Sequence, residues 1–223
     1  MEKKRDLKNS DGWRKCLENL PEAYKKWFQE EKEFLFKNIK RDSKILEVGC
    51  GDGRSINDLL KISENIIGLD IDENSVKIGK ERFAKYNKVK IVLGDANSLL
   101  FENKIFDCII CIGTFANFGE DKFRILEEMR RVLKDEGKII ISVYSNEALK
   151  ERLALYKKLN FKIKRIETNK GIVTCIFDDF NTEGISEQFS EKQLKEIAEK
   201  VNLNIEEIKK TKNKIAYLCL FSK

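Results

Sequence analysis

Three glycines at alternate positions form the segment with the clearest chemical signature. Gly49, Gly51 and Gly53 follow a short apolar run and precede a helical pattern, so they occupy a strand-to-helix turn. Glycines let a backbone turn sharply and come within contact distance of a ligand. The carboxylate of Glu47, two residues before the first glycine, would repel a diphosphate but attract a cation. A sulfonium that also carries an ammonium group is such a cation.

The spacing of this loop differs from that of the dinucleotide fingerprint. That fingerprint requires G-x-G-x-x-G, whereas the order here is G-x-G-x-G and Arg54 occupies the place of the last glycine. The loop therefore predicts a nucleoside ligand without the pyrophosphate of a dinucleotide.

Two further carboxylates end the next two predicted strands. Asp70 lies about 20 residues beyond the glycines, where an acid at the carboxyl end of a strand can chelate a ribose diol. Asp95 follows the third strand and is placed to accept a hydrogen bond from an adenine amino group. Ile71 and Ala96 are suitable apolar neighbours for a purine ring. A different role is expected for Asp72, which is predicted to cap the next helix.

Composition excludes several kinds of chemistry. The chain has no histidine, which removes Ser-His-Asp triads, Cys-His pairs and histidine zinc sites. Its six cysteines fall mostly in apolar runs, and Cys108 and Cys111 would point to opposite faces of one strand. No metal site and no disulfide are expected. Chemistry without imidazole is typical of proteins that use a reactive cofactor.

The elements that position these residues alternate between short apolar runs and helical patterns. Such alternation predicts βαβ units and a mostly parallel sheet with helices on both faces. The predicted strands are Lys44–Val48, Asn65–Leu69, Val89–Leu93, Phe106–Ile112 and Lys138–Tyr144, and the helices between them are Ser55–Ile62, Asn74–Tyr86 and Asp121–Leu133.

The order changes after Asn146. A helix over Glu147–Leu159 is followed by extended segments within about 161–189, which are predicted to form an insertion on the substrate side. Ser190–Val201 reads as a helix with a capping box formed by Ser190 and Gln193. The closing strands are Leu203–Lys209 and Lys214–Phe221, expected as a β-hairpin.

The region before Lys44 has a different pattern. Residues 11–40 read as helical, with Ser10 or Asp11 as a cap and Pro21 in the first turn of a second helix. We therefore expect an N-terminal helical lid over residues 1–43 and one Rossmann-like domain over 44–223.

Five segments, in order, resemble class I S-adenosylmethionine-dependent methyltransferases. They are the Glu47 glycine motif, Asp70, the Gly94–Ala96 segment, the strand opening Phe106-Asp107 and the Leu133–Lys138 segment. The resemblance implies a Rossmann-like, doubly wound sheet of about seven strands with an antiparallel last strand. Asp107, at the far end of its strand, is expected to be structural.

The resemblance also implies the ligands and the residues that hold them. The cofactor is S-adenosyl-L-methionine, and the product is S-adenosyl-L-homocysteine. The implied cofactor-binding residues are Glu47, Gly49, Cys50, Gly51, Gly53, Asp70, Ile71, Asp95, Ala96, Cys111 and Ile112. The expected acceptor-binding residues are Tyr24, Trp27, Thr114, Phe115 and Asn117, with Trp27 and Phe115 alternatively in the core. No catalytic base is identified.

The acceptor is left open by the sequence. The segment after the fourth strand lacks the prolines of amino-adenine methyltransferases and the Pro-Cys nucleophile of the cytosine-C5 class. It loosely resembles small-molecule methyltransferases, so a small molecule is the leading expectation. RNA or protein is the alternative, followed by a non-catalytic binding protein or an aminopropyl-type transferase.

Charge and hydropathy add few constraints. The net charge is +6, from 44 basic and 38 acidic residues spread along the chain, which allows nucleic acid without indicating it. The apolar runs are far shorter than the roughly 20 residues of a membrane span, and the charged N-terminus is not a secretory signal. A cytoplasmic protein is expected, and the oligomeric state cannot be predicted.

Overall fold

The computed structural model describes residues 20–179 and 182–223. The predicted cap at Ser10 or Asp11 and the thiol of Cys16 lie outside these residues. In the described part of the chain, no helix has the length and apolar character needed to cross a membrane.

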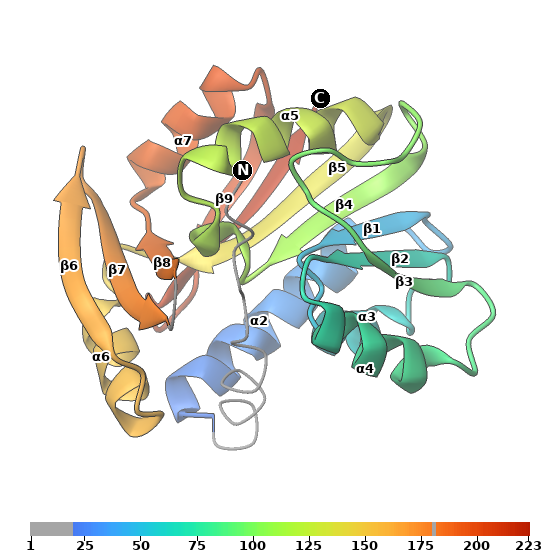
Figure 1. The fold of residues 1–223 in the computed structure, drawn as a ribbon. Helices are drawn as coiled ribbons and strands as arrows, with labels where there is room; N and C mark the ends of the chain where they lie inside the picture. The colour runs from blue at the N-terminus through green and yellow to red at the C-terminus, as the bar shows by residue number, and fades with distance from the viewer. Residues whose placement is uncertain (1–19, 180–181) are drawn as a thin grey trace.

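The core of the molecule is a seven-stranded sheet (Figure 1) with the strand order β3-β2-β1-β4-β5-β10-β9. Strands β1 to β5 run parallel, and β10 pairs antiparallel with both β5 and β9. The predicted Rossmann-like, mostly parallel sheet is confirmed. The strands are β1 (Ile45–Val48), β2 (Ile66–Asp70), β3 (Val89–Leu93), β4 (Phe106–Ile112), β5 (Leu133–Tyr144), β9 (Asn204–Lys210) and β10 (Ala216–Ser222).

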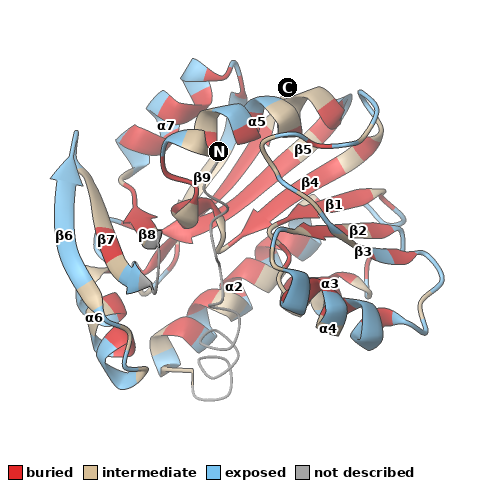
Figure 2. Ribbon diagram, in the orientation of Figure 1, coloured by how far each residue is buried: buried red, intermediate tan, exposed pale blue. Residues whose placement is uncertain are grey.

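Helices cover both faces of this sheet, which explains why its inner strands are continuously apolar. In Figure 1, α5 and α7 lie over one face, and α2, α3 and α4 lie under the other. Strands β1 and β4 are almost entirely buried (Figure 2). The helices are α2 (Glu22–Asn38), α3 (Arg54–Leu59), α4 (Glu73–Phe83), α5 (Lys122–Val132), α6 (Leu149–Lys158) and α7 (Glu191–Lys200).

A second, three-stranded antiparallel sheet stands beside the main one. It consists of β6 (Ile163–Asn169), β7 (Ile172–Asp179) and β8 (Thr182–Gln188). This sheet falls within the segment predicted as a substrate-side insertion. Strand β6 is largely exposed, whereas the end of β8 is buried and leads into Phe189 against Tyr144 of β5 (Phe189 N to Tyr144 O, 3.0 Å).

Helix α2 begins directly after Pro21 and presents aromatic side chains to the sheet. Tyr24, Trp27 and Phe34 are buried on its inner face. The turn between β9 and β10 holds the start of this helix, because Asn213 Nδ2 donates to Ala23 O at 2.6 Å. The N-terminal helix expected from the sequence is therefore present and packed against the sheet.

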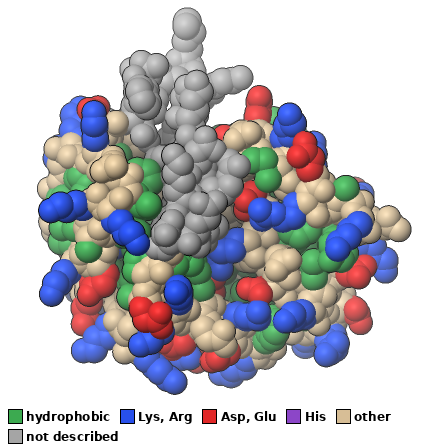
Figure 3. Space-filling view, turned by 90° about the horizontal axis from the view of Figure 1, so that it is seen from below, with side chains coloured by type: hydrophobic (Ala, Val, Ile, Leu, Met, Phe, Trp, Pro, Cys, Tyr) green, Lys and Arg blue, Asp and Glu red, His purple; other side chains and the backbone are tan. Residues whose placement is uncertain are grey.

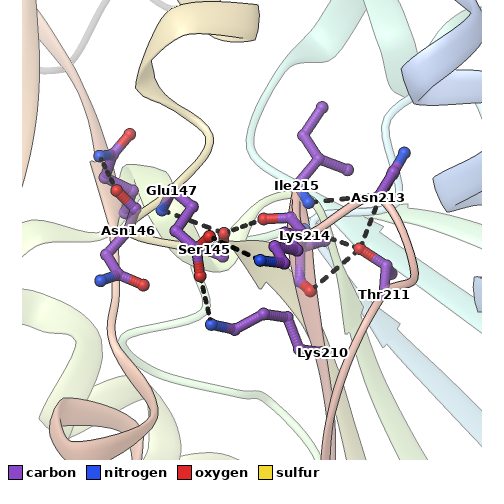
Figure 4. Close-up of polar contacts among 10 residues, drawn as sticks. Ser145, Asn146, Glu147, Lys210, Thr211, Asn213, Lys214 and Ile215 are labelled. Carbon is purple, nitrogen blue, oxygen red and sulfur yellow. Dashed lines mark hydrogen bonds and ion pairs between the residues drawn. The ribbon is translucent and has the colours of Figure 1, made fainter.

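The same turn is tied to the end of β5 (Figure 4). The Ser145 hydroxyl donates to Lys214 O, and Lys210 Nζ contacts Glu147 Oε1 at 2.6 Å. Thr211 and Asn213 close the turn through a hydroxyl–amide bond of 2.9 Å. These contacts fix the chain at the carboxyl end of β5, where α6 begins.

Local predictions agree with the observed caps. Asp72 caps α4 by accepting from Ser75 N at 2.8 Å, and Ser190 and Gln193 form the predicted capping box of α7. Asp107 is structural, since Oδ2 accepts from Lys44 N at 2.8 Å. The largest difference in a boundary is at β5, which begins at Leu133 rather than Lys138, because Leu133 already pairs with Phe106 across a bulge. The five cysteines among the described residues are buried free thiols: Cys50, Cys108, Cys111, Cys175 and Cys219.

Candidate functional site

The glycine loop between β1 and α3 adopts backbone conformations that require glycine. Gly49 has φ +73°, and a Cβ there would lie 2.3 Å from Thr114 Cγ2. Gly53 has φ +88°, and its Cβ would lie 2.3 Å from the ring of Phe83. The Thr114 hydroxyl donates to Gly49 O at 2.8 Å, so the loops that follow β1 and β4 are in direct contact.

Asp70 fixes the same loop from the neighbouring strand. Its Oδ2 accepts from Gly51 N at 2.7 Å, and its Oδ1 accepts from Asp72 N at 2.9 Å. Burial raises the pKa of Asp70, and these two backbone N–H donors oppose that effect. The carboxylate is thus held at the rim of the glycine loop, with lone pairs left to accept from a ligand.

Open space adjoins two glycines at the carboxyl edge of the sheet. A Cβ on Gly51 or on Gly113, which follows β4, would meet no atom within 4 Å. Both residues have positive φ, so their bare backbone faces this space. Near the ends of β2 and β3, Ile71 and Leu93 are 46% and 51% exposed, so apolar side chains adjoin this edge of the sheet.

The predicted adenine segment is solvent-facing. Asp95 is exposed, and its Oδ1 accepts from both Asn97 N (2.8 Å) and Asn97 Nδ2 (3.1 Å), which makes a local turn. Ala96 is half-buried beside it. The turn places this segment directly after β3, at the same sheet edge as Asp70.

Glu47 lies inside the protein beneath the loop. It is 1% exposed and accepts a hydrogen bond from the Ser55 hydroxyl, whereas Oε2 has no hydrogen-bond partner among the described residues. Burial raises its pKa to about 8, and the Ser55 bond only partly offsets this. A carboxyl group in this state is mostly protonated at neutral pH, and a cation bound beside it would favour loss of that proton to solvent.

A buried polar network next to Glu47 was not predicted from the sequence. Trp27 Nε1 donates to Ser142 Oγ at 2.9 Å, and the same hydroxyl donates to Glu31 Oε2. Glu31 Oε1 accepts from Arg54 Nη2 at 2.7 Å. Arg54 directly follows Gly53, so the network connects α2 and β5 to the glycine loop. The helical spacing of Glu31 was its only sequence signal.

The predicted acceptor residues fall into two groups, one on α2 and one in the loop after β4. Tyr24 and Trp27 are buried under β5, where Trp27 packs against Tyr144 with ring centroids 5.0 Å apart. Phe115 is 1% exposed and contacts Phe189 (5.7 Å), so its ring belongs to the core. Asn117 is half-buried next to it. Cys50, Cys111 and Ile112 are buried behind the loop.

The arrangement can bind a nucleoside and a cation at one edge of the sheet. It offers a constrained backbone loop, a fixed rim carboxylate at Asp70 and a buried carboxyl at Glu47. Exposed apolar side chains follow β2 and end β3. These features match the carboxyl-edge crevice in which parallel sheets bind ligands. They suit S-adenosylmethionine, which combines an adenosine with a sulfonium and an ammonium group.

Comparison with known proteins identifies a methyltransferase domain. Residues 46–141 match the model of a methyltransferase domain family. The Methanocaldococcus jannaschii protein MJ1252 is 34% identical over 75% of this chain and 66% of its own length. Demethylmenaquinone methyltransferase of Staphylococcus aureus is 34% identical over 54% of this chain and 52% of its own, so the chain matches about half of that enzyme.

A solved structure shares the whole fold. The 1,6-didemethyltoxoflavin-N1-methyltransferase of Burkholderia thailandensis, with S-adenosylhomocysteine bound, superposes with a TM-score of 0.68. The match covers 96% of this chain and 86% of that enzyme at 14% identity, and therefore speaks to the fold alone. With the domain match, the strand order and the glycine loop, the chain belongs to the class I S-adenosylmethionine-dependent methyltransferases.

Proposed function

We propose that this protein transfers the methyl group of S-adenosylmethionine to a small-molecule acceptor enclosed between α2, the loop after β4 and the β6–β8 sheet. The cofactor supplies an electrophilic methyl group on a positively charged sulfur. Its displacement leaves a neutral thioether, so the protein mainly needs to align the two reactants and exclude water.

The cofactor side of the proposal rests on the glycine loop. Asp70 is assigned to the ribose hydroxyls, and Ile71, Asp95 and Ala96 to the adenine. Glu47 is assigned to the ammonium group, because it is a buried carboxyl with one unpartnered oxygen. Other predicted contacts come from the loop after β1 and from the last residues of β4: Gly49, Cys50, Gly51, Gly53, Cys111 and Ile112.

The observation that carries the acceptor assignment is the open space beside Gly113, at the start of the loop that follows β4. Tyr24, Trp27 and Phe115 are 0%, 2% and 1% exposed, so their side chains are packed behind the site and leave no open groove among them for a macromolecule. An open space at the carboxyl edge of a parallel sheet suits a small ligand. Helix α2 would act as the cover of this region. Its anchoring to the β9–β10 turn favours a fixed wall over a freely opening lid.

The charge distribution supports the same choice. On the described part of the face viewed in Figure 3, acidic and basic side chains are mixed. A macromolecular nucleic-acid acceptor would favour a continuous basic rim. The names of two compared enzymes, acting on demethylmenaquinone and on a didemethyltoxoflavin, agree with a small acceptor. RNA or protein methylation is the alternative.

The test is transfer of labelled methyl from S-adenosylmethionine into a cell extract that is then separated into metabolites, RNA and protein. Label in the metabolite fraction is expected, and mass spectrometry of that fraction identifies the acceptor. Label confined to RNA or protein would replace this proposal with the alternative. Transfer of an aminopropyl group instead of methyl would leave the labelled methyl on the thioether product.

A further inference from the structure

Two cationic side chains are fully buried in the described part of the chain, and only one of them has a carboxylate partner there. Lys122, at the start of α5, lies 3.2 Å from the carboxylate of Glu187. Arg152, on α6, is 0% exposed and has no carboxylate partner among the described residues. Burying a charge is costly unless an opposite charge accompanies it.

All groups that accept hydrogen bonds from Arg152 are neutral. Nε and Nη2 donate to the Tyr156 hydroxyl (3.2 and 3.0 Å), Nη2 also donates to Ser186 O (3.0 Å), and Nη1 donates to Gln188 Oε1 (2.9 Å). These four bonds use four of the five guanidinium N–H groups. One N–H of Nη1 therefore remains for another acceptor.

The guanidinium is also held in a fixed plane. Its central carbon lies 4.2 Å from the ring centroid of Tyr144, an arrangement that partly compensates a cation in an apolar site. Gln188 is anchored in turn, because its Nε2 donates to Asn146 O at 3.1 Å. The surrounding residues therefore orient Arg152 without neutralising it.

The location of Arg152 is the acceptor side of the site. Tyr144 is the last residue of β5, and α6 follows it in the chain. Tyr144 also contacts Tyr24 and Trp27, the aromatic residues assigned to the acceptor wall, with centroid distances of 6.2 and 5.0 Å. The cation thus packs against Tyr144 at the carboxyl end of β5, the edge of the sheet at which ligands bind.

We infer that Arg152 recognises a carboxylate on the methyl acceptor, so that the substrates of this enzyme are small organic acids. This inference rests on the proposed function. A single guanidinium balances one negative charge, and its remaining Nη1 N–H can donate one charge-assisted hydrogen bond to a carboxylate oxygen. A phosphate with two charges would require a second cation, and none of the side chains that hydrogen-bond Arg152 is cationic.

The methionine carboxylate of the cofactor is the other possible source of such an anion. Strand β5 is separated from the glycine-loop strand β1 by β4, which corresponds to about 10 Å at the usual strand spacing. Glu47, assigned to the amino-acid end of the cofactor, lies on β1. The acceptor is therefore the better match, and the experiment separates the two sources.

The first arm uses the unaltered protein saturated with S-adenosylhomocysteine. Binding of acetate, benzoate and phenylacetate is measured by calorimetry and compared with acetamide, benzamide and phenylacetamide. At least one acid is expected to bind about tenfold or more tightly than its amide, because the amide lacks the charge that pairs with a guanidinium. Equal affinities, or no binding of any acid, would overturn the inference.

The second arm uses Arg152→Met and Arg152→Lys, with Lys150→Met on the same helix as the matched control. The acid that binds best should lose about 10- to 100-fold in affinity in Arg152→Met, while Lys150→Met binds as the unaltered protein does. Arg152→Lys should retain part of the affinity. Unchanged acid binding in a folded Arg152→Met protein contradicts the inference. If neither Arg152 variant folds, the first arm still decides.

The affinity for S-adenosylhomocysteine distinguishes a carboxylate of the acceptor from the carboxylate of the cofactor. S-adenosylhomocysteine should bind Arg152→Met as it binds the unaltered protein, and a loss of tenfold or more would assign Arg152 to the cofactor carboxylate and overturn the inference. A different result is expected if the proposed function, and not the role of Arg152, is wrong. Label would then be absent from the metabolite fraction although acids still bind beside Arg152.

Discussion

The two halves of the site solve the problem of buried charge in opposite ways. Beneath the glycine loop, Arg54 is matched by Glu31 at 2.7 Å, and this carboxylate is itself linked to Ser142. Behind the acceptor wall, Arg152 is surrounded by neutral hydroxyl, amide and carbonyl groups. In the first half the arginine is paired within the protein, whereas in the second the arginine gains its opposite charge from a ligand.

This difference teaches where specificity resides. The glycine loop, whose arginine is paired within the protein, can bind the same cofactor whatever the acceptor is. The acceptor side, whose arginine has no opposite charge, selects acceptors by their charge. Breaking the internal pair should therefore destabilise the protein, while changing the rim of the loop should affect only the cofactor.

The largest effect is expected from Glu31→Ala. Removal of this carboxylate leaves Arg54 and the Ser142 hydroxyl without their partner. The cost should be about 3 kcal/mol, the lower end of the range for buried pairs, because the Arg54 side chain is 26% exposed. Urea denaturation measures the loss. Lys195→Ala, which breaks the exposed Glu191–Lys195 pair, is the control and should cost about 0.5 kcal/mol or less. A loss below 1 kcal/mol for Glu31→Ala would show that the network is not structural.

The next effect concerns cofactor binding. Asp70→Ala removes the rim carboxylate and should weaken S-adenosylhomocysteine binding by about 1–3 kcal/mol, the value of hydrogen bonds to a charged group. Asp72→Ala is the matched control, because that residue caps α4 and should lower stability by about 1 kcal/mol without changing affinity. Unchanged affinity in Asp70→Ala removes this residue from the ribose role.

A pH dependence follows from Glu47. Burial raises its pKa to about 8, so at pH 7 the free protein carries mostly the neutral carboxyl group. An ammonium group beside it favours the carboxylate, so binding releases a proton. Affinity for S-adenosylhomocysteine should rise with pH, by at most tenfold per unit, and level off above about pH 8. Glu47→Gln should flatten this profile; a dependence that persists in the variant arises from another group.

The smallest effect on stability is expected from Gly51→Ala. The side chain would meet no protein atom, so the cost is the strain of a positive φ, about 1 kcal/mol. The methyl group would, however, project into the space assigned to the cofactor and weaken its binding. Gly171→Ala, at a hairpin turn with φ +82°, provides a control for strain away from the loop and sets an upper bound on its cost, because its Cβ would also lie 2.8 Å from Gln193 Nε2. Full affinity in Gly51→Ala would place the cofactor elsewhere.

The parts predictable from the sequence are those encoded by neighbouring residues. Gly49 and Gly51 are recognisable from their spacing, and Asp70 is recognisable from its position at the end of a strand. The parallel sheet follows from the alternation of apolar runs and helical patterns, and the caps at Asp72 and Ser190 follow from local hydrogen bonding.

The parts that escaped prediction depend on contacts between distant segments. Trp27 and Ser142 are 115 positions apart, and nothing in either neighbourhood signals their bond. Arg152 appears in the sequence as one more basic residue on a charged helix. Only its burial against β5 and β8 reveals that it lacks a counter-charge. The ambiguity of Phe115 was likewise resolved only by its packing against Phe189.

The most direct test of the account is a crystal structure of the complex with S-adenosylhomocysteine. The account predicts that the ribose hydroxyls contact Asp70, the adenine lies by Ile71 and Asp95, and the sulfur faces the loop after β4 at Gly113 and Thr114. It also predicts that Arg152 makes no contact with the ligand. A ligand whose carboxylate reaches Arg152, or whose ribose lies away from Asp70, would contradict the division of the site into a cofactor half and an acceptor half.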